Sequence, residues 1–171
     1  MICNSGNANT CNADGVEKAE LTCNQLAQQL QIQPQDVIVA STGVIGQPLN
    51  VETIVNAIPQ LVSGLSTTGS HAASEAIMTT DTQNKEFAVT VDLSGKAVTI
   101  GGIAKGSGMI HPNMATMLAF LTTDAAISPK ALQQALTLSV SNTYNMLSID
   151  GDTSTNDMAC IMASGLAGNP E

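Results

Sequence analysis

A period-two pattern near the middle of the sequence is the feature that most constrains the fold. Residues 87–93 alternate between apolar and other side chains, Ser94-Gly95 supplies a turn, and an apolar run follows over residues 97–100. Alternation on both sides of a short turn predicts a β-hairpin. Because this antiparallel pair lies among helical segments, we predict an α/β (α+β) architecture with mixed β-sheets rather than a doubly wound parallel sheet.

Helices and further strands surround the predicted hairpin. Apolar residues at helical spacing predict a helix that begins with a capping box at Asp14 and ends before Pro34. Ser128-Pro129 predicts the start of another helix, with a buried stripe at Leu132, Ala135, Leu136 and Val140. Short strands are predicted at residues 36–40 and 117–121. Further helices are expected at residues 51–65, where Pro59 interrupts the pattern, at residues 71–78, and from residue 158 through 164.

Composition limits both the core and the partners. The 171 residues fit one domain, and because 43% are hydrophobic but only 2% aromatic, the core must be aliphatic. A net charge of −9, with five lysines and no arginine, disfavours nucleic acid and anionic membranes as partners. The four cysteines lack CxxC spacing and there are two histidines, so we expect no metal site. Reduced thiols in a cytoplasmic protein are the default.

The segment from Lys105 to Phe120 contains the main candidate for catalysis. A glycine-rich loop is followed by Ala115, Thr116 and a short apolar run. A self-cleaving enzyme needs such a threonine, since its hydroxyl can attack the preceding carbonyl and the freed α-amine can then serve as its base. The alternative is that Thr116 is simply a residue of a core strand, where threonine is common.

Two other groups of residues suit acyl transfer. Thr42-Gly43 follows a predicted strand, so a hydroxyl and a backbone N–H can converge there as donors to an oxyanion. The alternative is a plain turn between strand and loop. Lys105 could hold a carboxylate near the nucleophile, or it could be a solvated lysine in a flexible loop. The sequence order Lys105-Gly106 does not match a phosphate-binding loop, in which Gly precedes Lys.

Two polar segments are assigned no catalytic role. Residues 4–9 are small amides and hydroxyls typical of a turn-rich loop. Residues 150–157 place oxygen ligands at alternate positions, but the sixth position is Thr155 and the twelfth is Ile161, whereas a calcium loop needs Gly and Glu there. We therefore expect residues 150–157 to form a polar, hydrogen-bonded loop near the active site.

Six sequence blocks together resemble the ArgJ family of glutamate/ornithine N-acetyltransferases. The blocks occur in the family's order and extend over essentially the whole chain. They are Asn4-Ser-Gly-Asn-Ala-Asn9, Ala40-Ser-Thr-Gly-Val-Ile-Gly46, Ala76-Ile-Met-Thr-Thr-Asp-Thr82, Ile100-Gly-Gly-Ile-Ala-Lys-Gly-Ser-Gly-Met-Ile110, Pro112-Asn-Met-Ala-Thr-Met-Leu118 and Asp150-Gly-Asp-Thr-Ser-Thr-Asn-Asp157.

The resemblance implies a fold and a set of site residues. The fold would consist of β-sheets sandwiched with helices, as in the self-processing DmpA-type aminopeptidases. Cleavage between Ala115 and Thr116 would make residues 1–115 part of an α chain and residues 116–171 the start of a β chain. Thr116 would be the nucleophile, and Thr42 with Gly43 would form the oxyanion hole. Lys105 and Thr79 would bind substrate, with the neighbouring Thr80 as the open alternative to Thr79.

The resemblance also implies an activity and partners. Such an enzyme passes an acetyl group from N-acetylornithine to glutamate through acetyl-Thr116, with no metal or organic cofactor, and some members also use acetyl-CoA. Its α and β chains usually form a heterotetramer. Family chains are more than twice as long, so we expect this chain to be a central fragment. The alternatives are a related self-processing amidase or aminopeptidase, and an inactive fragment.

Overall fold

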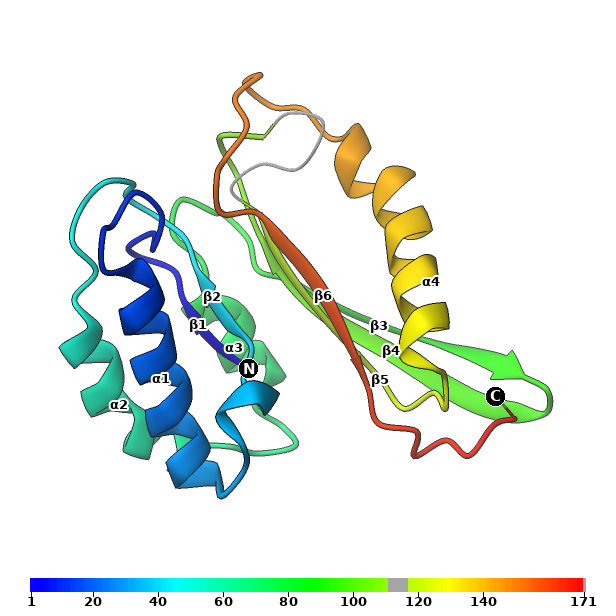
Figure 1. Cartoon of the computed structure of the whole chain (residues 1–171). Coiled ribbons are helices and arrows are strands. Elements are labelled where there is room, and N and C mark those ends of the chain that lie inside the picture. The colour runs from blue at the N-terminus through cyan, green and yellow to red at the C-terminus, as the bar shows by residue number, and fades with distance from the viewer. Residues whose placement is uncertain (111–116, 171) are drawn as a thin grey trace. The chain divides into compact units, whose positions relative to one another are not determined.

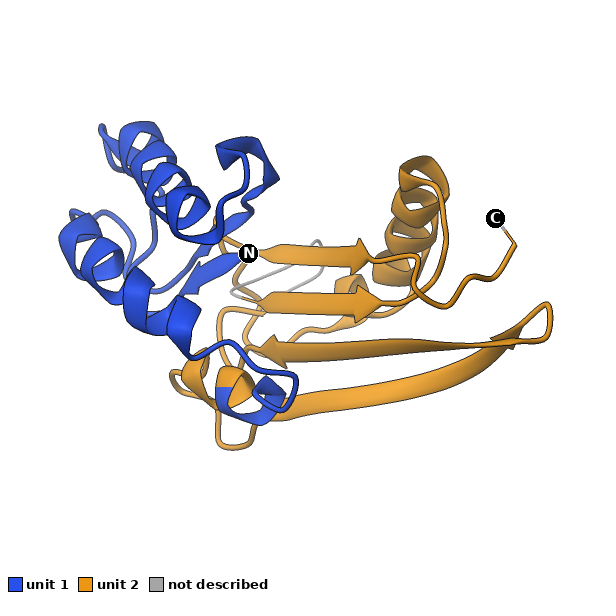
Figure 2. Cartoon of the chain, turned by 90° about the horizontal axis from the view of Figure 1, so that it is seen from below, with its two compact units in different colours: residues 1–72 blue, residues 73–171 orange. Residues whose placement is uncertain are grey.

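The computed structural model describes residues 1–110 and 117–170. The chain divides into two compact units, residues 1–72 and residues 73–171 (Figure 2). Helices and strands are mixed, and the sheets contain both parallel and antiparallel pairs, which confirms the predicted fold class. The predicted chain boundary between residues 115 and 116 lies outside the described residues. Among the helices of residues 1–110 and 117–170, none combines the length and the apolar character that crossing a bilayer requires.

The first unit packs two helices beside a two-stranded parallel sheet (Figure 1). Its elements are β1 (Ile2–Asn4), α1 (Gly15–Leu30), a 3₁₀ turn (Pro34–Asp36), β2 (Val39–Ser41) and α2 (Val51–Ser63). The centre of the core is formed by Ile2, Leu26 and Ile58, one from the sheet and one from each helix. This core is aliphatic, as the composition predicts.

Three expectations for the first unit need correction. Pro59 does not interrupt α2, because burial of neighbouring Ile58 at 1% exposure offsets the lost backbone hydrogen bond. Asp14 forms no side-chain cap on α1 and instead pairs with Lys18 at 2.9 Å, so the predicted capping box is wrong. β2 begins only at residue 39, since residues 34–36 turn as a 3₁₀ helix.

The second unit is built on a four-stranded mixed sheet (Figure 1). Its order is β3-β4-β5-β6, with antiparallel pairing in the first two pairs and parallel pairing in the last. Its strands are β3 (Lys85–Leu93), β4 (Lys96–Lys105), β5 (Leu118–Thr123) and β6 (Met158–Ala163). The short helix α3 (Ser70–Ala76) spans the boundary of the units, and α4 (Pro129–Ser141) follows β5 and contacts β6.

The structure confirms the hairpin and the start of α4. Ser94 and Gly95 have φ of 55° and 81°, the left-handed conformations of a two-residue hairpin turn between β3 and β4. Ser128 accepts a hydrogen bond from the Ala131 N–H at 3.3 Å, which makes it the predicted N-cap of α4. In the predicted stripe of α4, Val140 is buried, whereas Ala135 is exposed and does not belong to it.

The predicted helix at residues 158–164 is wrong. Residues 158–163 form β6, which pairs in parallel with β5 from Leu118↔Met158 to Thr123↔Ala163. A short apolar run fits either a buried strand or a buried helix segment by its pattern alone. Residues 158–163 form a strand because pairing with the open edge of β5 satisfies the backbone N–H and C=O groups of both segments.

Candidate active site

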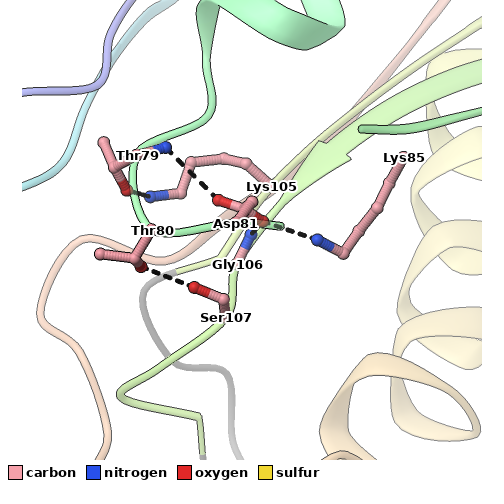
Figure 3. Close-up of polar contacts among 7 residues, drawn as sticks. All are labelled: Thr79, Thr80, Asp81, Lys85, Lys105, Gly106 and Ser107. Atoms are coloured by element: carbon pink, nitrogen blue, oxygen red, sulfur yellow. Dashed lines mark hydrogen bonds and ion pairs between the residues drawn. The ribbon is translucent and has the colours of Figure 1, made fainter. Parts of the chain in front are cut away.

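The hairpin brings Thr79 and Lys105 together although 26 positions separate them in the sequence. Thr79 lies in the connection between α3 and β3, and Lys105 is the last residue of β4. Because Lys85 at the start of β3 pairs with Ala104, both segments reach the same end of the sheet. There Lys105 Nζ donates a hydrogen bond of 3.3 Å to Thr79 Oγ1 (Figure 3). The structure therefore places the two predicted substrate residues in contact.

Lys105 is a buried cation rather than a surface one. Only 2% of its surface is exposed. Lysine is almost never buried without partners, since removing an ammonium group from water is costly. The interpretation of Lys105 as a solvated lysine is thus wrong. The Thr80 hydroxyl instead pairs with Ser107 Oγ at 2.6 Å, so Thr79 is the threonine whose hydroxyl accepts from Lys105.

Asp81 is a site residue that the sequence reasoning missed. Its side chain is 1% exposed and is paired with Lys85 Nζ at 2.6 Å. It also accepts the Gly106 N–H at 2.7 Å and the Thr79 N–H at 3.5 Å (Figure 3). Burial favours the neutral acid, but the Lys85 and backbone hydrogen bonds outweigh it and hold the pKa of Asp81 below its ordinary value. Asp81 is therefore a buried carboxylate that stays ionised at neutral pH.

The predicted nucleophile Thr116 and its neighbour Ala115 lie outside the described residues. The strand that follows them in the sequence is described, and it begins at the same end of the sheet. Leu118, two positions after Thr116, pairs with Lys105 on one side and with Met158 on the other. Lys105 is thus held beside the strand that Thr116 precedes.

Residues 150–157 bind the backbone on both sides of residues 111–116. Asp150 accepts the Met109 and Ile110 N–H groups at 2.5 and 2.8 Å. Asp157 Oδ1 accepts the Met117 N–H at 2.7 Å. These contacts confirm that the segment is a hydrogen-bonded polar loop. Sequence reasoning had assigned no separate role to its two terminal aspartates.

Asp157 is electrostatically unusual. Its Oδ2 is buried and has no hydrogen-bond partner among the residues that the structure describes. Burial raises the pKa of Asp157 from 3.8 to about 6, although the Met117 N–H and the charge of Lys105 act in the opposite direction. Asp157 can therefore change its protonation state near neutral pH. No sequence pattern reveals this, because the shift arises from packing.

Thr42 and Gly43 form the exit turn of β2 in the first unit. Thr42 is 1% exposed and its N–H donates to the Asn4 carbonyl at 2.9 Å. Gly43 has φ of +129°, and a Cβ there would lie 2.4 Å from the carbonyl carbon of Gly6. Thr42 and Gly43 thus hold a hydroxyl and a backbone N–H at adjacent positions of the turn, the two kinds of donor that an oxyanion hole requires.

The amide-rich segment at residues 4–9 supports this turn. The Asn4 side chain donates to Ser41 Oγ at 3.1 Å and to the Asn7 carbonyl at 2.8 Å. Ser41 Oγ in turn donates to the same Asn7 carbonyl at 2.6 Å. The small, polar residues of this segment thus allow a close backbone approach to Gly43. Their part in the site is one of support, which the turn-rich pattern alone did not indicate.

Comparison with known proteins identifies the family. A family model described as the ArgJ family matches residues 1–171. The arginine biosynthesis bifunctional protein ArgJ of Symbiobacterium thermophilum is 50% identical over 171 residues, which cover 99% of this chain and 42% of the relative. The protein of the same name from Chlorobaculum tepidum is 55% identical over 166 residues, covering 96% of this chain and 41% of the relative.

A solved structure supports the same relationship. The crystal structure of arginine biosynthesis bifunctional protein ArgJ from Bacillus halodurans matches with a TM-score of 0.60 and 45% identity, over 67% of this chain and 61% of that one. The fold expected from the resemblance is thereby confirmed. The chain spans about 42% of the length of the curated relatives that it matches. Since the family model covers all 171 residues, the chain belongs to the ArgJ family.

Proposed function

We propose that the protein carrying this chain is an acyltransferase that moves an acetyl group from N2-acetylornithine to glutamate. The observation that carries the proposal is the family match over residues 1–171, with relatives named arginine biosynthesis bifunctional proteins. The contact between buried Lys105 and Thr79, beside the strand that Thr116 precedes, supports it. The setting of this reaction would be arginine biosynthesis in the cytoplasm.

The first step is cleavage of the chain between Ala115 and Thr116. The Thr116 hydroxyl attacks the Ala115 carbonyl, and the peptide nitrogen leaves as the α-amine of Thr116 while it gains the hydroxyl proton. Water then hydrolyses the resulting ester, which leaves a carboxylate on Ala115 and a free hydroxyl on Thr116. The new α-amine has an ordinary pKa of ~8, so a useful fraction of it is unprotonated at neutral pH.

Acetyl transfer then uses the same hydroxyl twice. The α-amine of Thr116 takes the hydroxyl proton as the oxygen attacks the acetyl carbonyl, and ornithine leaves with that proton. The amine of glutamate next attacks acetyl-Thr116 and gives up a proton, which the α-amine passes to the departing Thr116 oxygen, so that N-acetylglutamate and the free enzyme result. The Thr42 hydroxyl and the Gly43 N–H would stabilise the oxyanion of both tetrahedral intermediates. No metal or organic cofactor would take part, and acetyl-CoA is the alternative donor that some family members use.

Substrate recognition falls to the second unit. The ammonium of Lys105 would pair with the substrate carboxylate, and the Thr79 hydroxyl, which accepts from Lys105, would fix the direction of that ammonium. The relatives' greater length leaves room for further substrate contacts. The α and β chains would remain associated as a heterotetramer.

The test is the intact mass of the protein expressed from the complete reading frame that encodes this chain. We expect two chains that divide before Thr116 in the wild type and a single uncut chain in Thr116→Ala. Thr122→Ala is a matched control, because it removes another threonine hydroxyl from the same region of sequence, and it should still divide. A wild type that stays whole, or divides at another bond, would exclude the proposed nucleophile.

A further inference from the structure

Asp81 joins the two segments that carry the predicted substrate residues. Its donors are the N–H of Thr79 itself, the N–H of Gly106, which follows Lys105, and the ammonium of Lys85. Two of these belong to the backbones on either side of the Lys105–Thr79 hydrogen bond (Figure 3). The carboxylate therefore fixes the spacing between the two backbones from which Lys105 and Thr79 project.

The burial of Asp81 makes this link stiff. Because only 1% of its side chain is exposed, bulk water does not reach the carboxylate to replace a donor that it loses. Gly106, its partner, has φ of +150°, a conformation that glycine adopts more readily than other residues. A hydrogen bond at this point therefore restrains a residue whose backbone would otherwise have several accessible conformations.

Lys85 gives the link its charge balance. It lies at the start of β3 and its side chain is 47% exposed, so the pair extends from the interior to solvent. Its Nζ and the Gly106 N–H both bind Asp81 Oδ1, at 2.6 and 2.7 Å. Loss of Lys85 would leave the buried carboxylate with its backbone donors but without the cation that binds it, which favours its protonation.

We propose that Asp81, with Lys85 as its counter-ion, is the positioning residue that aligns Lys105 and Thr79 for the substrate carboxylate. This rests on the proposed function, since the substrate is the acetylated amino acid named there. Asp81 acts through the two residues and does not touch the reacting atoms. Its replacement should therefore weaken substrate binding more than it slows the chemical step.

The experiment compares steady-state kinetics of the complete protein and two asparagine variants with N-acetylornithine and glutamate. Asp81→Asn should raise the KM for N-acetylornithine about tenfold and change kcat by less than about threefold, because the nucleophile is unaffected. Asp124→Asn is the matched control. Asp124 accepts the Thr99 N–H at 2.8 Å elsewhere on β4, so the same chemical change is made away from Lys105. It should leave KM unchanged.

The pH dependence of KM separates positioning from a merely structural role. Lys85→Gln should raise the KM for N-acetylornithine as pH falls, because the pKa of Asp81 rises without its cation. The double variant Asp81→Asn with Lys85→Gln should lack this additional pH dependence, since the Thr116 α-amine contributes equally to every variant. Equal KM values in Asp81→Asn and Asp124→Asn, or a KM in Lys85→Gln that follows the wild type at every pH, would overturn the proposal.

A second readout is independent of activity. Amide hydrogen exchange at Gly106 should accelerate in Asp81→Asn and stay at the wild-type rate in Asp124→Asn. If the wild type transfers no acetyl group, the proposed function fails, and unchanged exchange at Gly106 would separately overturn the link. If the wild type is active and the exchange is unchanged, only the positioning role of Asp81 fails.

Discussion

At the scale of single residues, Asp157 has the most consequential environment. One carboxylate oxygen binds the Met117 N–H at 2.7 Å, while the other is buried without a partner in the described part of the chain. An ionised carboxylate in such a place costs free energy, and this is why the pKa rises to about 6. The native state therefore holds this proton more tightly than the unfolded chain does.

Stability should accordingly depend on the protonation of Asp157. A raised pKa contributes stability that is fully present below the ordinary value of 3.8 and is lost as pH rises through about 6. Relative to the wild type, Asp157→Asn should thus gain unfolding free energy as pH rises from about 4.5 to about 7.5, by about 1 kcal/mol after solvent screening. Urea unfolding at a series of pH values measures this difference.

The control for this pH effect lies in the same loop. Asp152 is exposed, so Asp152→Asn removes one negative charge without altering the buried site. Its unfolding free energy should follow the wild type across the same range. The lowered pKa values of Asp81 and Asp150 affect the unfolding free energy at lower pH and with the opposite sign. Both residues are present in the wild type and in both variants, so their contributions cancel in the comparison. A constant offset between Asp157→Asn and the wild type would contradict the assignment.

At the scale of elements, the exit turn of β2 depends on the absence of a side chain at Gly43. Gly43→Ala would place a Cβ 2.4 Å from Gly6 and 2.7 Å from the Asn7 nitrogen, so the backbone must move. Gly46 is the matched control, because its φ is also positive, +75°, but nothing lies within 4 Å of its Cβ position. Gly46→Ala should cost about 1 kcal/mol of stability from strain alone, and Gly43→Ala about 1–3 kcal/mol more. Thermal unfolding of both variants gives the comparison, and equal losses would refute the close-contact explanation.

The hairpin and the start of α4 were predicted from local signals, although the local signal for a capping box at Asp14 was misleading, and the strand β6, which tertiary contacts decide, was not predicted. The hairpin at residues 85–105 and the cap at Ser128 follow from turn and cap chemistry, which acts over a few residues. The strand β6 could not be distinguished from a helix, because its six apolar residues become a strand only by pairing with β5. Pro59 likewise remains helical through packing of α2 that no local pattern indicates.

The candidate site divides in the same way. Thr79 and Lys105 were named from resemblance, and their contact at 3.3 Å confirms that they are neighbours. Asp81 and Asp157 belong to the sequence blocks that resemble the ArgJ family, yet their importance arises from burial and from hydrogen bonds to backbone groups 25 and 40 positions away. Almost any residue type can supply a backbone N–H, so the sequence does not indicate such a hydrogen bond. A structure is therefore needed to find the residues that accept it.

At the scale of the whole molecule, the predicted donors and the predicted binding residues belong to different compact units. Thr42 and Gly43 lie in residues 1–72, and Thr79 with Lys105 in residues 73–171. A reaction that uses both groups therefore needs both units, and kinetics should be measured on the complete protein. In the proposed mechanism, the acetyl group stays bound to the enzyme after ornithine leaves and before glutamate reacts.

A covalent acetyl-enzyme intermediate predicts isotope exchange. With N-acetylornithine and labelled ornithine but no glutamate, label should enter N-acetylornithine, because acetyl-Thr116 can return its acetyl group to ornithine. The exchange rate should lie within about tenfold of overall turnover, and double-reciprocal plots at several glutamate concentrations should be parallel. Thr116→Ala should abolish exchange, whereas Thr122→Ala should retain it. Release of acetate without exchange would instead identify water as the acceptor, as in an amidase, and would overturn the transferase assignment while leaving Thr116 as the nucleophile.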